Sequence, residues 1–174
     1  METAIISVIC IALLVLGWST MSRNYISSVD SATVELGLMT ENSREIVRTD
    51  LSTLTATQPS ADLLDVTLRN TGQVKLGSFD RWDVIVQYTD SGATYYVKWL
   101  TYTTGVLGDN EWKKTAIYVG GTTDAEVFEP GILNPGEDLK FQVKLNPTVG
   151  TGTDNLVIIS TPNGIAASIA FTGF

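Results

Sequence analysis

The chain opens on an uninterrupted apolar run, Ala4-Ile5-Ile6-Ser7-Val8-Ile9-Cys10-Ile11-Ala12-Leu13-Leu14-Val15-Leu16-Gly17-Trp18. The run has about fifteen residues, fewer than the roughly twenty of a transmembrane helix and close to the core of a signal peptide. A secretory signal carries Lys or Arg before its apolar core and a small-residue cleavage site after it. Here the only charged side chain before the run is Glu2, and the first basic residue is Arg23. Two uses remain: a permanent membrane anchor, or a segment that lies in a membrane temporarily and is then buried against copies of itself.

The residues that follow the run keep a helical pattern. Apolar or small side chains recur at alternating spacings of three and four residues, at Val29, Ala32, Leu36, Met39, Ser43 and Ile46. This spacing is typical of a stripe that packs against other helices. Extending the stripe backwards leads through Tyr25 and Trp18 to Leu14 without a change of phase, so the two segments form one predicted helix. At about 1.5 Å per residue, its length from residue 3 to residue 50 is on the order of 70 Å.

A helix that is apolar all round at one end and striped at the other cannot bury its own surface. Full burial of each large aliphatic side chain contributes about 1.5–3 kcal/mol, so lipid or neighbouring subunits must cover the helix. The predicted helix–helix assembly interface consists of Ile5, Ile6, Ile9, Leu13, Leu14, Leu16, Trp18, Tyr25, Val29, Leu36, Met39 and Ile46.

Glu2 has two interpretations. Its carboxylate pairs with the terminal amine of a neighbouring chain during assembly, or it interacts favourably with the positive end of its own helix dipole. The first interpretation predicts a charge contact between subunits at the start of the chain.

The composition changes abruptly at residues 49–61. This segment is polar, rich in threonine and contains Pro59, which a helix interior does not accept. We therefore predict a hydrophobic to amphipathic helix over residues 1–54, a linker over 55–61 and a second domain over 62–174.

From residue 62 onward the apolar pattern has a period of two. The clearest alternation places Leu139, Phe141 and Val143 on one face, with Lys140 and Gln142 on the other. Further strands are predicted near residues 64–69, 82–88, 94–101, 112–119, 156–160 and 165–171, separated by turns such as Asn134-Pro135-Gly136 and Pro162-Asn163-Gly164. Seven or eight short strands at this spacing predict an antiparallel β-sandwich, and the fold class is therefore α+β.

The composition argues against several functions. The formal net charge is −8, so binding to a nucleic-acid backbone has no electrostatic support. The chain has no histidine, which excludes Ser-His and Cys-His nucleophile pairs and removes the usual zinc ligands. Its one cysteine, Cys10, lies inside the apolar run and is expected to behave as a small hydrophobe. We therefore predict a protein that is not an enzyme and has no cofactor.

Calcium is the one metal for which the sequence offers ligands. Carboxylates and turn carbonyls suit a hard cation, and acidic loops occur at residues 109–111, 123–124 and 153–155. None of these loops has a known calcium-binding pattern, so the acidic residues are interpreted first as solvated surface charges.

The layout resembles the mature subunits of the type IV pilin superfamily. An apolar N-terminal helix without a basic leader continues into an amphipathic rod and is followed by an all-β head. Within the superfamily, the segments Leu64-Asp65-Val66-Thr67-Leu68-Arg69-Asn70-Thr71-Gly72 and Leu133-Asn134-Pro135-Gly136-Glu137 are similar to archaellins, the archaeal flagellins. Bacterial pilins usually carry Glu at the fifth mature position, and Ile5 suits archaellins better.

The resemblance implies an architecture, a function and a set of partners. A prepilin-type peptidase would remove a leader, the helices would bundle into a filament core, and immunoglobulin-like heads would cover the outside. The expected role is that of a homopolymeric extracellular filament subunit for motility, held in the membrane before assembly and served by platform and motor proteins. Two alternatives stay open: a subunit of an adhesive type IV-like pilus, or a single-copy membrane-anchored accessory or stator protein of the archaellum machinery.

Overall fold

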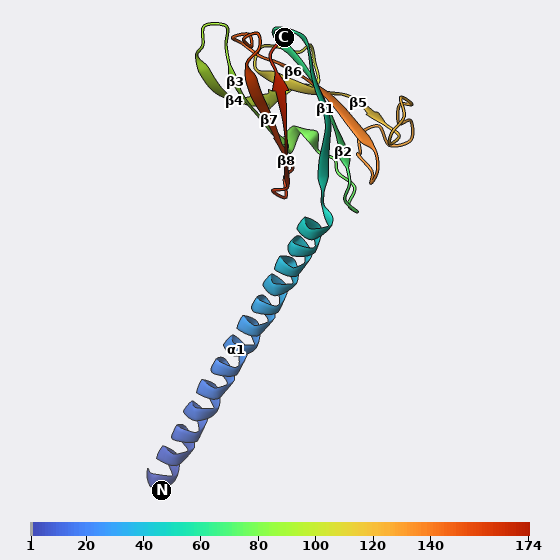
Figure 1. Ribbon diagram of the computed structural model, residues 1–174. Helices are drawn as coiled ribbons and strands as arrows, with labels where there is room; N and C mark the ends of the chain where they lie inside the picture. The colour runs from blue at the N-terminus through green and yellow to red at the C-terminus, as the bar shows by residue number, and fades with distance from the viewer. Residues whose placement is uncertain (1) are drawn as a thin grey trace. The chain divides into compact units, whose positions relative to one another are not determined.

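The computed structural model describes the backbone of residues 2–174 and the side chains of residues 5–22, 25, 27–41 and 43–174. The chain forms two compact units, residues 1–44 and residues 45–174. The first is helical, and the second, which we call the head, contains eight strands (Figure 1). The predicted α+β class, with a long N-terminal helix followed by a β-sandwich, is confirmed.

Helix α1 runs without interruption over Glu2–Arg48, a length of 47 residues. It has no proline, and the apolar run and the amphipathic segment continue into one another, as the phase of the stripe predicted. The last turn of α1, from Glu45, belongs to the head unit.

The head strands are short and follow one another closely in the chain. Their bounds are β1 Leu51–Ser60, β2 Leu63–Asn70, β3 Asp83–Thr89, β4 Tyr95–Tyr102, β5 Glu111–Tyr118, β6 Asp138–Lys144, β7 Asp154–Ser160 and β8 Ala166–Thr172. A short 3₁₀ turn, η1 at Phe79–Arg81, precedes β3.

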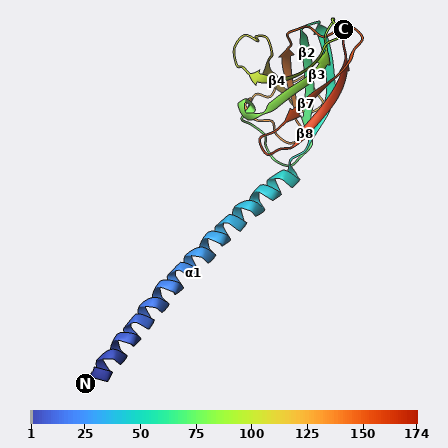
Figure 2. The same cartoon turned by 90° about the vertical axis from the view of Figure 1, so that its left-hand side faces the viewer.

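The strands form two sheets in the order β1-β2-β6-β5 and β4-β3-β7-β8. Neighbours within each sheet are antiparallel, and the two sheets join where β4 and β5 pair in parallel at Thr101–Glu111 and Tyr102–Trp112. This chain order is that of an immunoglobulin-like sandwich whose second sheet has one additional edge strand, β4. Figure 2 shows the β8-β7-β3-β4 sheet on the side that faces the viewer.

The core lies between the two sheets and follows the predicted alternation. Leu139, Phe141 and Val143 of β6 are fully buried, and they lie opposite Leu68, Val66 and Leu64 of β2. Val84 and Val86 of β3 supply the facing layer, and Trp112 of β5 lies beside Val143 in the first sheet. The alternation therefore predicted correctly which side of these strands is buried.

The predicted boundary between helix and head needs correction. The helix ends at Arg48, not at residue 54, and the predicted linker over residues 55–61 lies mostly within β1. Thr53, Thr55 and Thr57 are β-branched residues that suit a strand, and β1 pairs with β2 along its length. The threonine-rich composition therefore indicates strand propensity here, and not a linker.

Candidate assembly surfaces

An apolar stripe runs along α1, and its described side chains are exposed in the single chain. All twelve residues of the predicted interface are exposed, from Ile46 at 42% to Trp18 at 80%. They lie along one helix, so the structure does not bring them together with a partner, and their role in assembly stays a prediction. Glu2 lies outside the residues whose side chains the structure describes.

Several of the described hydroxyl groups of α1 are hydrogen-bonded within the helix itself. Thr33, Thr40 and Ser43 each donate a hydrogen bond to the backbone carbonyl four residues earlier, at 2.8 Å. Thr20 and Ser31 form the same kind of bond at 3.1 and 3.0 Å. A hydroxyl that is already bonded can enter an apolar environment at little cost. These polar residues therefore do not prevent burial of the helix surface in lipid or among other helices.

The N-terminal part of α1 meets the physical requirements of a membrane span. An 18-residue window has a mean hydropathy of 2.2, and none of it is buried inside the structure. On one face of this region, Trp18, Met21 and Tyr25 line a shallow concave strip with Ser22 and Ser28. Length and composition thus allow this segment to lie in a bilayer.

The end of α1 is held by two loops of the head. Thr49 donates its hydroxyl to the carbonyl of Glu45 at 2.8 Å, and Asn163 of the β7–β8 turn donates to that hydroxyl at 2.8 Å. From the β2–β3 loop, the Gln73 amide donates to the carbonyl of Arg48 at 2.7 Å, and the Gly72 amide donates to that of Asp50 at 3.1 Å. The last carbonyl of α1, that of Arg48, is therefore satisfied by the β2–β3 loop.

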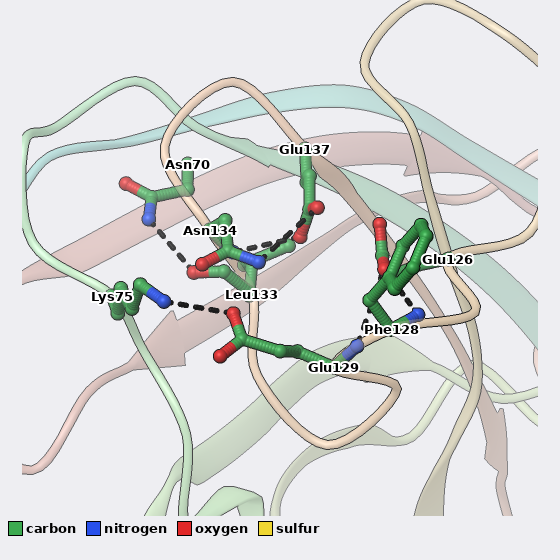
Figure 3. Close-up of polar contacts among 8 residues, drawn as sticks. All are labelled: Asn70, Lys75, Glu126, Phe128, Glu129, Leu133, Asn134 and Glu137. Atoms are coloured by element: carbon green, nitrogen blue, oxygen red, sulfur yellow. Dashed lines mark hydrogen bonds and ion pairs between the residues drawn. The ribbon is translucent and has the colours of Figure 1, made fainter.

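The two turn segments that carry the archaellin resemblance meet in the head. The buried Asn70 side chain donates to the carbonyls of Val74 and Leu133 at 2.8 and 3.0 Å, as Figure 3 shows in part. The backbone carbonyl of Asn70 accepts from the amide of Gly136 at 2.7 Å. Glu137 accepts hydrogen bonds from the backbone and side-chain nitrogens of Asn134, which closes the predicted turn. Gly136 has φ of 87°, the left-handed conformation that this turn position requires.

Next to these turns, an ion pair joins β2 to β6. The Arg69 guanidinium donates two bonds to Asp138, at 2.6 and 2.9 Å, and the Gly121 amide adds a third at 3.1 Å. The bonds from Arg69 lower the pKa of Asp138 below its ordinary value, although burial acts in the opposite direction. The ionised Asp138 side chain therefore links β6 to β2 through Arg69 and to the β5–β6 loop through Gly121.

The β5–β6 loop holds two exposed apolar residues at its tip, Val127 at 80% and Phe128 at 95% exposure. The Glu126 carboxylate accepts hydrogen bonds from the amides of Phe128 and Glu129, at 2.7 and 3.2 Å (Figure 3). These backbone bonds lower the pKa of Glu126 below its ordinary value, and they link its carboxylate to the backbone of the tip. Lys75 pairs with Glu129 at 2.8 Å and fixes the base of the loop.

A second exposed apolar feature lies on β4. Tyr95, Val97 and Trp99 point to the same side of the strand and are 61%, 59% and 62% exposed. We call these three residues the platform. The sequence pattern predicted no role for the platform or for the tip. The available signal was that Tyr95, Val97 and Trp99 place three large apolar residues on one face of the strand, which a solvated face does not require.

One of the acidic loops considered for calcium, residues 109–111, is engaged with protein groups. Asp109 pairs with Lys144 at 3.2 Å and accepts from Asn146 at 2.9 Å, and Glu111 accepts from the amide of Gly108 at 2.8 Å. Among the residues that the structure describes, no group of three or more His, Cys, Asp or Glu side chains is arranged to hold a metal ion.

Comparisons with solved structures show which proteins have this fold. The archaeal flagellum of Methanospirillum hungatei strain JF1 matches with a TM-score of 0.58 and 13% identity, over 95% of this chain and 90% of that chain. The archaellum periplasmic stator protein FlaG from Sulfolobus acidocaldarius matches with a TM-score of 0.52 and 20% identity, over 71% of this chain and 99% of that chain. The archaellum periplasmic stator protein complex of FlaF and FlaG from the same organism matches with a TM-score of 0.52 and 21% identity, over 70% of this chain and 87% of that chain. No family model and no curated protein matches the sequence. The chain thus shares its fold with structural components of the archaellum, both filament and stator.

Proposed function

We propose that this protein is the structural subunit of a homopolymeric, archaellum-like extracellular filament that serves motility, with α1 packed in the core and the head outside. The observation that carries the proposal is the length over which α1 is apolar. The role is mechanical and includes no catalytic step.

A bilayer can cover only the first half of this apolar surface. The hydrocarbon core is about 30 Å thick and takes roughly twenty helical residues, whereas 47 residues form a rod of about 70 Å. A span that begins at Ile5 ends near Asn24, but Val29, Leu36 and Met39 are still exposed beyond it. Helices of neighbouring copies, which carry the same stripe, can cover both halves.

Before assembly, the subunit is anchored in the membrane by the N-terminal part of α1. No charged residue occurs between Glu2 and Arg23, so this segment can lie in lipid without burying a charged side chain. By resemblance to the pilin superfamily, a prepilin-type peptidase and platform and motor proteins are the partners of this step.

The extent of the structural likenesses supports the filament function. The likeness to the flagellum covers 95% of this chain, so it must include most of the helical unit of residues 1–44. The likenesses to the stator proteins cover 70–71% of this chain. The head unit alone is about three quarters of the chain, so it can account for that coverage without the helical unit.

A second candidate function is a membrane-anchored accessory or stator protein. The near-complete coverage of the FlaG chain, with a TM-score close to that of the flagellum, favours it. An adhesive type IV-like pilus would use the same helical core as an archaellum, and only the presence of a rotary motor would separate the two.

Substitution of two leucines of α1 tests whether the stripe is buried in the filament core. Leu36 belongs to the stripe, Leu38 points to the opposite side of the helix, and both are 63% exposed. Both lie beyond the membrane-length segment. We expect Leu36→Asp to abolish filaments while the chain still accumulates in the membrane, and Leu38→Asp to retain them. Electron microscopy of purified surface appendages, with peptide mapping, reads the result.

The same preparation separates the two functions. If the unaltered chain is missing from every filament and is recovered in the membrane fraction alone, the accessory function holds and the filament proposal fails.

A further inference from the structure

The platform on β4 has the polar atoms of its two aromatic side chains already bonded. Trp99 Nε1 donates to Asp83 at 2.8 Å, and the Tyr95 hydroxyl donates to Gln87 at 3.1 Å. In the strand register Trp99 lies opposite Ile85 and Tyr95 opposite Thr89, so each ring reaches diagonally across β3 in the same direction. The exposed parts of the rings are therefore apolar surface that a partner can cover without breaking a hydrogen bond.

The tip of the β5–β6 loop has complementary properties. Glu126 is engaged within the loop by backbone amides, Glu129 is engaged by Lys75 of the β2–β3 loop, and Lys114 donates to the carbonyl of Pro130. These bonds hold the backbone that carries Phe128, so less backbone freedom is lost when the exposed ring binds.

The size of the platform indicates what kind of partner covers it. Tyr95 and Trp99, at 61–62% exposure, each present on the order of 100–150 Å², and the platform presents a few hundred Å² in all. A stable complex between free proteins buries about 800 Å² on each partner. The platform is thus too small to hold a freely diffusing protein, but it is large enough for one that is already held nearby. A second copy of this chain is such a partner once the α1 helices have bundled, so the inference rests on the proposed function.

The platform and the tip lie on opposite sides of the head. In Figure 1 the β3–β4 hairpin lies at the left of the head, and the loop that follows β5 lies at the right. Two different patches on opposite sides form a heterologous contact, and a heterologous contact that does not close on itself propagates into a filament. We propose that in the polymer the Val127–Phe128 tip of one head docks on the Tyr95–Val97–Trp99 platform of a second copy.

Cysteine cross-linking tests this contact. Cys10 is the only cysteine, so Cys10→Ala gives a cysteine-free chain in which V97C and F128C are introduced together. We expect oxidised filaments of this double variant to give a ladder of covalent multimers on non-reducing gels, because each chain forms one bond with each of two neighbours. Each single variant should give no ladder. The matched control combines V106C with F128C, since Val106 is as exposed as Phe128 but lies outside the platform.

The outcomes of the cross-linking experiment distinguish a failure of the docking from a failure of the proposed function. Filaments without a ladder, or with no more cross-linking than the V106C control, overturn the docking and leave the proposed function intact. Dimers from V97C alone also overturn it, because they show that two platforms face each other. If the unaltered chain forms no filament, the proposed function fails and the docking fails with it.

A second measurement needs no cysteine. Phe128→Asp is expected to lower the temperature at which filaments dissociate, whereas Val106→Asp should leave it unchanged. Equal dissociation temperatures for these two variants would overturn the docking.

Discussion

Asn70 shows how a single polar side chain organises the head. It is fully buried at the end of β2, donates to two carbonyls and accepts from the amide of Gly72 at 3.0 Å. A buried amide with these partners satisfies backbone groups that would otherwise be unpaired inside the protein. The residue thus joins the β2–β3 loop to the turn before β6, and it holds in place the loop that carries Phe128.

Asp138 gives a prediction about pH. Because its pKa is lowered in the folded head, its ionised form adds stability that is fully present above the ordinary carboxyl range and is lost as the pH falls through the folded pKa. We expect Asp138→Asn to reduce the free energy of unfolding of the head by roughly 1–3 kcal/mol at pH 7. The difference from the unaltered head should shrink below about pH 4. Denaturant titrations at several pH values measure it, and a difference that stays constant with pH would contradict this assignment.

At the scale of elements, the junction between α1 and β1 depends on a close approach of backbones. A Cβ at Gly72 would lie 2.5 Å from the amide nitrogen of Asp50 and 2.6 Å from the carbonyl oxygen of Arg48. Both contacts are with backbone atoms, which cannot rotate away. The β2–β3 loop can therefore reach the end of the helix only with glycine at this position.

Gly72→Ala is expected to lower the free energy of unfolding of the head by about 1–3 kcal/mol, because the loop must move away from the helix end. Gly77→Ala in the same loop is the control, since its Cβ would meet only the carbonyl of Gly131 at an ordinary 3.6 Å. Thermal or denaturant unfolding of both variants reads the difference. Equal losses for the two alanines would mean that the junction tolerates the side chain.

At the scale of the whole molecule, the two units differ in what they need. The head has its own buried core, whereas the described apolar side chains of α1 up to Arg44 are exposed and need an external partner. A fragment of residues 45–174 is expected to fold, stay soluble and remain monomeric at micromolar concentration, because the platform is far smaller than a stable dimer interface. The full chain should require detergent or form polymers. Light scattering after gel filtration tests both, and a stable dimer of the fragment would contradict the size argument.

Much of the fold could be predicted because its signals are local. The stripe of α1 and the alternation of β6 depend on the period of side chains along one element, which the sequence states directly. β1 was missed because its two leucines, Leu51 and Leu54, are three residues apart, so no apolar period of two marks the strand. What makes the segment a strand is its pairing with β2, a property of another part of the chain.

By itself, the sequence determined the helix, the α+β class and the need of α1 for a partner, since burial and period follow from residue type and spacing. Only the tertiary structure decided where the helix ends, that Asn70 bonds to Leu133 across 63 positions, and that β4 and the β5–β6 loop hold their aromatic residues in solvent. These features depend on contacts between segments far apart in the chain. Residue spacing along one segment carries no information about such contacts.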